Sequence, residues 1–309
     1  MDTNAPLPTH SVPTAHRPLT TAPAGRHADA ARSSGDELVR RWLRQGKVWL
    51  LPLLLSDYGR DLIYRKYDAI ATDRAYANRP SGRLGPLGKA VDWIVLQQDI
   101  HAGLRQRLAL VVDEVAAAVG ERWAQGTPNV RLASGPCGLA RDLRLVWQRL
   151  GAPAGRLELL GLDLDASGEV LPLAAGLAAE AGVPLQTRRC DLLDHEALRD
   201  RLGARPADVF LSIGLTVWLD PPDLATFLEG LHRSLAPGGT LIVDSFRAHG
   251  ASRFAKDLEM KTRYHDQAAF ERSLQQAGFA VMAMRETANR VNCVYRCRRV
   301  GHGTTDEHR

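Results

Sequence analysis

Hydrophobic and polar positions divide the chain into a helical stretch and a stretch where strands and helices alternate. Between residues 36 and 128 apolar residues recur at helical spacing, and no strand-like alternation interrupts them. Asp36 stands where it can cap the first of these helices. The longest apolar run, VWLLPLLL at 48–55, is interrupted by Pro52, and it indicates a buried or groove-lining helix.

After residue 128 short β-rich runs alternate with amphipathic helices. Strands separated by helices of this length form a parallel sheet with right-handed crossovers. The last two strands follow each other closely, so they are expected to be antiparallel neighbours. The pattern predicts an α/β fold, a doubly wound seven-stranded sheet that is mostly parallel with an antiparallel last strand, preceded by a helical N-terminal section. The predicted strands are 129–133, 157–163, 183–190, 208–214, 239–246, 279–287 and 292–299.

This pattern predicts four segments. Residues 1–35 are rich in Pro, Thr, Ala and His without periodicity, which is typical of a disordered tail. Residues 36–128 form a helical section that we expect to act as a lid over the substrate, with the connection 246–265 closing the other side. Residues 129–300 form the sheet domain, and 301–309 a flexible tail.

Composition and charge narrow the classes of function. The chain has 309 residues and a net charge of +5, with Lys and Arg spread along it, which argues against a nucleic-acid partner. No apolar run reaches the roughly 20 residues of a membrane span, and residues 1–35 contain no secretory core. Cys137, Cys190, Cys293 and Cys297 form no CxxC pair, so we expect neither a metal site nor disulfides, but a cytoplasmic protein. A homodimer is left open.

The stretch VRLASGPCGLARD at 130–142 runs from a strand through a glycine-containing turn into a helix. In a doubly wound sheet, ligands bind beyond the carboxyl ends of the strands, where the strand order reverses. A GxGxxG spacing would indicate a nicotinamide dinucleotide, but only Gly135 and Gly138 are present.

The same stretch resembles motif I of the class I S-adenosylmethionine (SAM)-dependent methyltransferases, whose first strand ends in a G-x-G-x-G turn beneath the cofactor. On this template the three glycine positions are Ala133, Gly135 and Cys137, and Arg131 replaces the family's common acid. LAPGGTLIVD at 235–244 resembles the family's helix, Pro-Gly-Gly turn and fifth strand. The resemblance covers about 129–299, and 61–83 loosely resembles the N-terminal part of uncharacterised bacterial methyltransferases.

The resemblance implies SAM as cofactor and places its ligands at successive strand ends. Asp163 occupies the position of the acid that accepts hydrogen bonds from the ribose hydroxyls, with Asp165 as the alternative. Asp191 matches the acid that receives the adenine amino group, and Leu192 would supply a backbone N–H and an apolar wall. Each acid has a competing interpretation as a helix cap or turn former. The implied cofactor-binding residues are Ala133, Ser134, Gly135, Asp163, Leu164, Asp191, Leu192 and Gly214.

Methyl transfer requires chiefly the in-line positioning of the acceptor, and a base helps only where the acceptor must lose a proton. On position alone, the candidates for catalysis are His101, His249 and Tyr58. The candidates for substrate binding are Trp218, just past the fourth strand, and Tyr64 and Tyr67, for which packing against the core is the competing interpretation.

The run DPPD at 220–223 resembles the DPPY of adenine amino methyltransferases, but no aromatic residue follows, so we expect its prolines to open a helix. The leading hypothesis is a methyltransferase acting on a small molecule, a metabolite or natural product. One alternative is an RNA or protein methyltransferase, motivated by the basic charge. Another is a catalytically silent binding module, motivated by the lost glycines and Arg131.

Overall fold

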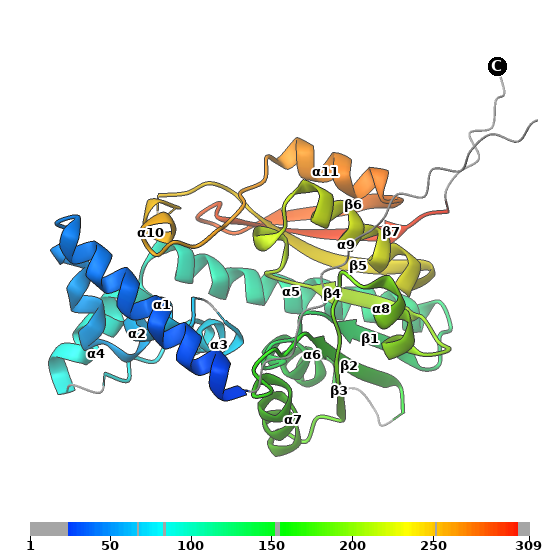
Figure 1. The fold of residues 1–309 in the computed structure, drawn as a ribbon. Helices are drawn as coiled ribbons and strands as arrows, with labels where there is room; N and C mark the ends of the chain where they lie inside the picture. The colour runs from blue at the N-terminus through cyan, green and yellow to red at the C-terminus, as the bar shows by residue number, and fades with distance from the viewer. Residues whose placement is uncertain (1–23, 67, 83–84, 152–154, 251, 302–309) are drawn as a thin grey trace, which may run out of the picture.

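The computed structural model describes residues 24–66, 68–82, 85–151, 155–250 and 252–301. Its seven strands form one sheet in the order β3-β2-β1-β4-β5-β7-β6 (Figure 1). Strands β1 to β5 pair in parallel, whereas β7 is antiparallel to both β5 and β6. This confirms the predicted fold class, and the strand order reverses between β1 and β4. The strands are β1 Val130–Ser134, β2 Leu157–Asp163, β3 Leu185–Arg189, β4 Ala207–Ser212, β5 Leu235–Phe246, β6 Phe279–Glu286 and β7 Asn292–Arg299.

Alternate residues of the strands face two helical layers, as the period of a strand requires. On β1, Leu132 packs into a core with α5, α6 and α7, whereas its neighbour Ala133 packs into the core of the opposite face with α8, α9 and α11. The central strands are buried on both faces, which explains their nearly continuous apolar sequences. These helices are α5 Asp99–Ala124, α6 Arg141–Leu150, α7 Val170–Glu180, α8 His195–Leu202, α9 Pro221–Ser234 and α11 Gln267–Gln276.

Aspartate caps fix where several helices begin, because their carboxylates accept hydrogen bonds from the free N–H groups of the first turn. Asp194 begins α8, Asp220 begins α9 and Asp266 begins α11. Two prolines occupy the first positions of α9. The DPPD run therefore opens a helix, as predicted.

The N-terminal section is helical, as predicted, but its first helix begins at Ala24 and not near Asp36. The prediction that the first helix begins near Asp36 was therefore wrong. The side chain of Asp36 does not cap that helix; it accepts a hydrogen bond from Tyr64 Oη at 3.0 Å. The rest of the predicted N-terminal tail, and residues 302–309 of the C-terminal one, lie outside the described residues. The helices of this section that precede α5 are α1 Ala24–Arg44, the 3₁₀ helix η1 Val48–Leu55, α2 Asp57–Tyr64, α3 Ala69–Ala77 and α4 Gly85–Leu96.

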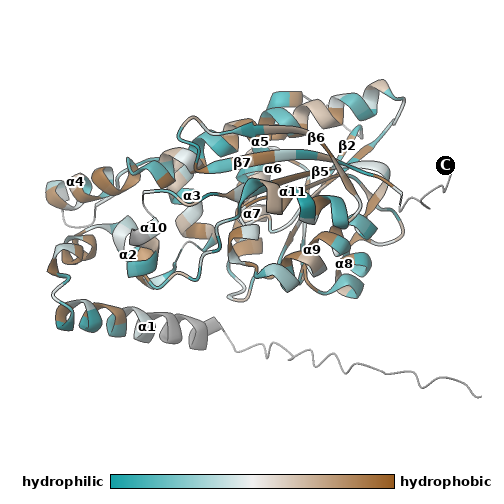
Figure 2. Ribbon diagram, turned by 90° about the horizontal axis from the view of Figure 1, so that it is seen from above, coloured by the Kyte–Doolittle hydropathy of each residue, from teal (hydrophilic) through white to brown (hydrophobic). Residues whose placement is uncertain are grey.

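The helical section lies over one end of the sheet and shares a core with the loop 247–265, which contains α10 Ser252–Asp257 (Figures 1 and 2). Trp42 of α1 donates its indole N–H to the carbonyl of Asp257 at 3.1 Å, and Lys47 forms a 2.6 Å ion pair with the same residue. Arg41 pairs with Glu259. These contacts fasten the loop to α1. None of the described helices combines the length and apolar character that crossing a membrane requires.

Candidate functional site

Two adjoining cavities lie at the carboxyl ends of the central strands. The larger, of about 470 Å³, is bounded by the loops after β1, β2 and β4 and by α3 and α5. The smaller, of about 80 Å³, lies between α5, the 3₁₀ helix η2 (Thr216–Trp218) and the loop 247–265. Both are lined by Thr72, Arg107, Gly214 and Trp218, so they meet at these four residues. The larger cavity is within the range of about 300–1,000 Å³ that is usual for small-molecule sites.

The loop after β1 is thin and is fixed to both neighbouring strands. Gly135 donates its N–H to the carbonyl of Leu211 on β4 at 2.9 Å, and Cys137 donates to that of Leu162 on β2 at 2.8 Å. A Cβ atom at Gly135 would lie only 2.9 Å from the side chain of Leu192. A larger residue at Gly135 would therefore require the side chain of Leu192 to shift.

The loop residues that line the larger cavity come slightly later in the sequence than the three glycine positions of motif I. Pro136, Cys137 and Gly138 line the cavity. The predicted residues Ala133, Ser134 and Gly135 are buried and are not among the residues that line it. The sulfur of Cys137 lies against Gly161, where an added Cβ would come within 2.9 Å of it. The cysteine at the third glycine position therefore packs its side chain against β2.

Asp163 stands at the end of β2 and lines the larger cavity. One carboxylate oxygen accepts the N–H of Gly138 at 2.9 Å, and the other accepts the N–H of Asp165 at 3.0 Å. Burial raises the pKa of this carboxyl group. Each oxygen of an ionised carboxylate has about two acceptor sites, so Asp163 can accept further hydrogen bonds from ligand hydroxyls. Leu164, also predicted, lines the same cavity.

Asp165, the alternative to Asp163, has a structural role. It accepts the N–H groups of Val170 at 3.0 Å and Leu171 at 3.1 Å, at the start of α7. Ser167 donates its hydroxyl to one of the same oxygens at 3.3 Å. The carboxylate of Asp165 is thus used to cap α7.

The structure does not place Asp191 beside Asp163 in the larger cavity. Its carboxylate accepts the N–H of Leu193 at 3.0 Å in a local turn, and it lines neither cavity. Leu192 is buried beneath Gly135. For Asp191 the turn-forming interpretation is therefore the one that the structure shows.

A buried polar cluster occupies the junction of the two cavities, and sequence reasoning missed it. Arg107 is 2% exposed and pairs with Asp244 through one terminal nitrogen, while the other donates to the hydroxyl of Tyr76. The second oxygen of Asp244 accepts the N–H of Gly214 at 2.8 Å. A buried charge needs partners of this kind. The signal in the sequence was a pair of arginines, Arg105 and Arg107, at the start of the run LRQRLALVV, and helical periodicity alone did not show that Arg107 is the buried one.

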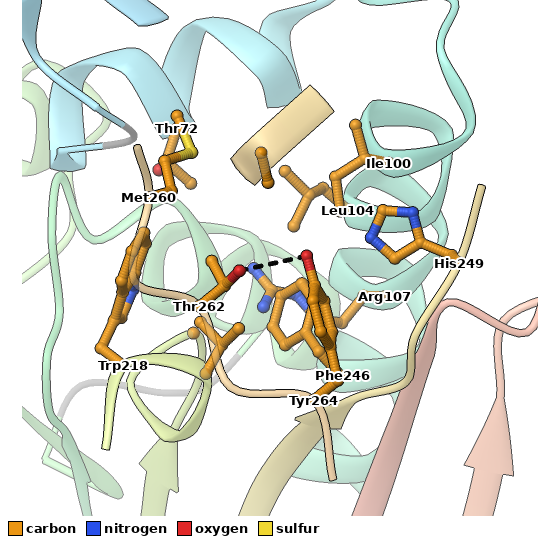
Figure 3. Close-up of a pocket in the computed structure, with 13 residues that line it drawn as sticks. Thr72, Ile100, Leu104, Arg107, Trp218, Phe246, His249, Met260, Thr262 and Tyr264 are labelled. Carbon is orange, nitrogen blue, oxygen red and sulfur yellow. Dashed lines mark hydrogen bonds between the residues drawn. The ribbon is translucent and has the colours of Figure 1, made fainter. Parts of the chain in front are cut away.

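The smaller cavity is mainly apolar, with a polar group of three residues on one side (Figure 3). Thr262 donates its hydroxyl to that of Tyr264 at 3.1 Å, and the ring of His249 meets that of Tyr264 edge-on at 5.6 Å. Burial lowers the pKa of His249, which keeps its imidazole neutral near pH 7 and able to accept a proton. The apolar lining residues are Ile100, Leu104, Val217, Trp218, Phe246, Ala255 and Met260.

His101, Tyr58 and Tyr64 line neither cavity, contrary to the predicted roles. His101 is fully buried, its Nδ1 lies 2.7 Å from the carbonyl oxygen of Val95, and burial lowers its pKa to about 4. The ring of Tyr58 packs against it at 5.1 Å. These residues belong to the core of the helical section, because a histidine or tyrosine on an apolar helix face packs inward. Tyr67, also predicted, lies outside the described residues.

No group of three or more His, Cys, Asp or Glu that could hold a metal ion occurs in the described part of the chain. All four cysteines are free and buried. The expected cytoplasmic location stays a prediction.

The chain has the fold of the class I SAM-dependent methyltransferases. It is similar to a protein from Bordetella parapertussis described as a possible exported protein, with a TM-score of 0.67 and 21% identity over 93% of this chain and 100% of that one. It is also similar to magnesium protoporphyrin IX methyltransferase from Synechocystis PCC 6803, solved with bound S-adenosylhomocysteine, with a TM-score of 0.50 and 15% identity over 78% of this chain and 100% of that one. No protein-family model and no curated protein matches the sequence.

Proposed function

We propose that this chain is a SAM-dependent methyltransferase that transfers a methyl group to a small-molecule acceptor, a metabolite or natural product, by in-line displacement. The observation that carries the proposal is the larger cavity, into which Asp163 points beside the thin loop at Gly135–Gly138. In this fold the cavity lies where the strand order reverses, which is the usual ligand position.

The residues present fit this cofactor. Asp163 would accept the ribose hydroxyls, while Pro136 and Gly138 leave room above the loop. Gly214 at the end of β4 faces the junction, where a side chain would approach Arg107 to 3.4 Å. When bound, SAM supplies a methyl group that its sulfonium makes electrophilic. The chain's own contribution is to orient the two reactants and to exclude water.

The acceptor would occupy the smaller cavity and reach the cofactor between Arg107, Gly214 and Trp218. Its lining is apolar except for a few side chains, and no carboxylate belongs to the described lining. Such a surface favours a largely apolar, uncharged or anionic acceptor group over a cationic one. A volume of about 80 Å³ admits only the reacting end of a molecule.

Arg107 and Arg141 are the only Lys or Arg residues in the described lining of the two cavities, and each is paired with an aspartate, which weighs against a nucleic-acid substrate. The absence of two motif I glycines motivated the hypothesis of a catalytically silent binding module. That argument is weaker because the sulfur of Cys137, at one of the two positions, packs against Gly161.

Calorimetric titration with S-adenosylhomocysteine tests the proposal directly. The wild-type chain is expected to bind this ligand and to show no heat of binding with NADH. The loop after β1 lacks the GxGxxG spacing that would bind the pyrophosphate of NADH. Absence of S-adenosylhomocysteine binding would contradict the proposed function.

His249 is expected to act as the base where the acceptor must lose a proton. With radiolabelled SAM and a metabolite extract of the source organism as acceptor mixture, His249→Ala should reduce label transfer by about 10²–10⁴-fold. Its affinity for S-adenosylhomocysteine should be unchanged, because His249 lines only the smaller cavity. His195→Ala, on α8 and outside both cavities, is the control, and equal transfer by His249→Ala and wild type would contradict the role.

A further inference from the structure

The larger cavity is lined by four aspartates, of which Asp68 caps α3, Asp165 caps α7, and Asp163 stands at the end of β2. The fourth is Asp142. Asp142 lies in the first turn of α6 and lines the cavity. It accepts the N–H of Leu143 at 2.7 Å, and the hydroxyl of Ser134 approaches its other oxygen at 3.4 Å. Asp142 interacts electrostatically with Arg107, whose guanidinium lies beside Gly214 just after β4, so Asp142 stands toward the β4 side of the cavity. Asp163 stands at the end of β2.

Two of the cations near Asp142 are paired with other carboxylates. Arg107 pairs with Asp244, and Arg141 forms two hydrogen bonds to Asp73 at 2.7 and 2.9 Å. Among the described residues no ion pair involves Asp142. Burial raises its pKa to about 6, an effect that its hydrogen bonds and the nearby charge of Arg107 offset only in part. The other titratable groups around it are Tyr76, Cys137 and Arg144.

The residue at the family's acidic position on β1 is an arginine, so it cannot bind a positively charged group of a ligand. Arg131 of β1 is buried, donates to the carbonyl of Leu202 at 2.6 Å, and forms an ion pair with Glu158 at 3.1 Å. It lines neither cavity. The carboxylate that remains on the β4 side of the larger cavity is Asp142.

We propose that Asp142 binds the ammonium group of the cofactor's amino-acid portion, so that this chain supplies the anchor from α6 in place of β1. The inference rests on the proposed function. Asp142 and Asp163 then hold opposite ends of one ligand, which leaves the sulfur between them, toward the junction with the smaller cavity. A charge-assisted hydrogen bond in a partly dry cavity is stronger than a neutral one.

Two ligands that differ only in the amino-acid portion separate this role from a structural one. S-Adenosylhomocysteine carries the ammonium group, whereas 5′-methylthioadenosine retains the adenosine and the sulfur but lacks the amino acid. By calorimetry, Asp142→Asn is expected to weaken S-adenosylhomocysteine binding by about 10- to 100-fold and to leave methylthioadenosine binding unchanged. Asp163→Asn is the matched control, because it should weaken both ligands.

The pH dependence gives a second readout that a structural role would not produce. As the pH falls through about 6, Asp142 of the free protein gains a proton and loses its charge. The preference of the wild type for S-adenosylhomocysteine over methylthioadenosine should therefore decrease, and that of Asp142→Asn should stay constant.

The outcomes are distinct. Equal weakening of both ligands in Asp142→Asn, or unchanged S-adenosylhomocysteine affinity, would overturn the assignment of Asp142 while leaving the proposed function intact. If the wild type binds neither ligand, it is the proposed function that fails. Thermal unfolding of ligand-free Asp142→Asn checks that the variant is folded, since removing a carboxyl group whose ionisation burial opposes should not lower its stability at neutral pH.

Discussion

Asp163→Asn is expected to weaken the binding of S-adenosylhomocysteine by at least about 100-fold, because two hydrogen bonds from the ribose hydroxyls would lose their charged acceptor. In the wild type the carboxylate accepts hydrogen bonds from the backbone N–H groups of Gly138 and Asp165. The substitution places the NH₂ group of asparagine opposite one of these two donors, so that hydrogen bond is lost. The loops after β1 and β2 would thus be less firmly joined. Isothermal calorimetry with purified variant and wild type measures the effect.

Asp191→Asn is the control for this experiment. It removes a carboxylate of the same type from the next strand end, but Asp191 lines neither cavity and serves a local turn. Its affinity for S-adenosylhomocysteine should equal that of the wild type. If Asp163→Asn binds as tightly as the wild type, Asp163 does not contact the ribose. If Asp191→Asn loses as much affinity as Asp163→Asn, the cavity extends to β3 when the ligand binds.

Arg107→Met is expected to lower the free energy of unfolding by about 3–5 kcal/mol, because it leaves the charge of Asp244 buried without its partner. Tyr76 would lose the donor to its hydroxyl in the same step. Urea denaturation monitored by circular dichroism measures the change, and the loss should appear without any ligand present.

Two further variants isolate the cause. Arg107→Met combined with Asp244→Asn should recover part of the loss, since the stranded charge is removed with its partner. Arg149→Met breaks an exposed 3.5 Å pair with Asp113 and should cost no more than about 1 kcal/mol. Equal stability of Arg107→Met and Arg149→Met would show that the buried pair contributes no more than a surface one.

The sheet could be predicted from the sequence because burial on both faces and helical crossovers leave a strong periodic signal. All seven strands lie where the apolar runs indicate, and DPPD opens a helix as its prolines suggest. The start of α1 was missed because the sequence before Asp36 has the composition of a tail.

The candidate site was less predictable, since its residues come from segments far apart in the chain. Asp163, Gly214 and Trp218 stand at strand ends, so topology alone places them near the cavities. Arg107 and Asp142 lie on helices, where only tertiary packing shows that they meet. His101 and His249 could not be told apart by sequence, because burial in a core and exposure to a cavity leave the same residue type on the same kind of apolar background.

The fastening of the loop 247–265 to α1 has an evolutionary consequence. Trp42 and Lys47 hold this loop through Asp257, and the loop contributes Met260, Thr262 and Tyr264 to the smaller cavity. If the smaller cavity holds the acceptor, as proposed, substitutions in α1 and just after it would change acceptor selectivity and leave the residues at β1 and β2 unaltered. Relatives that share this sheet would then diversify by substitutions in and just after their first helix.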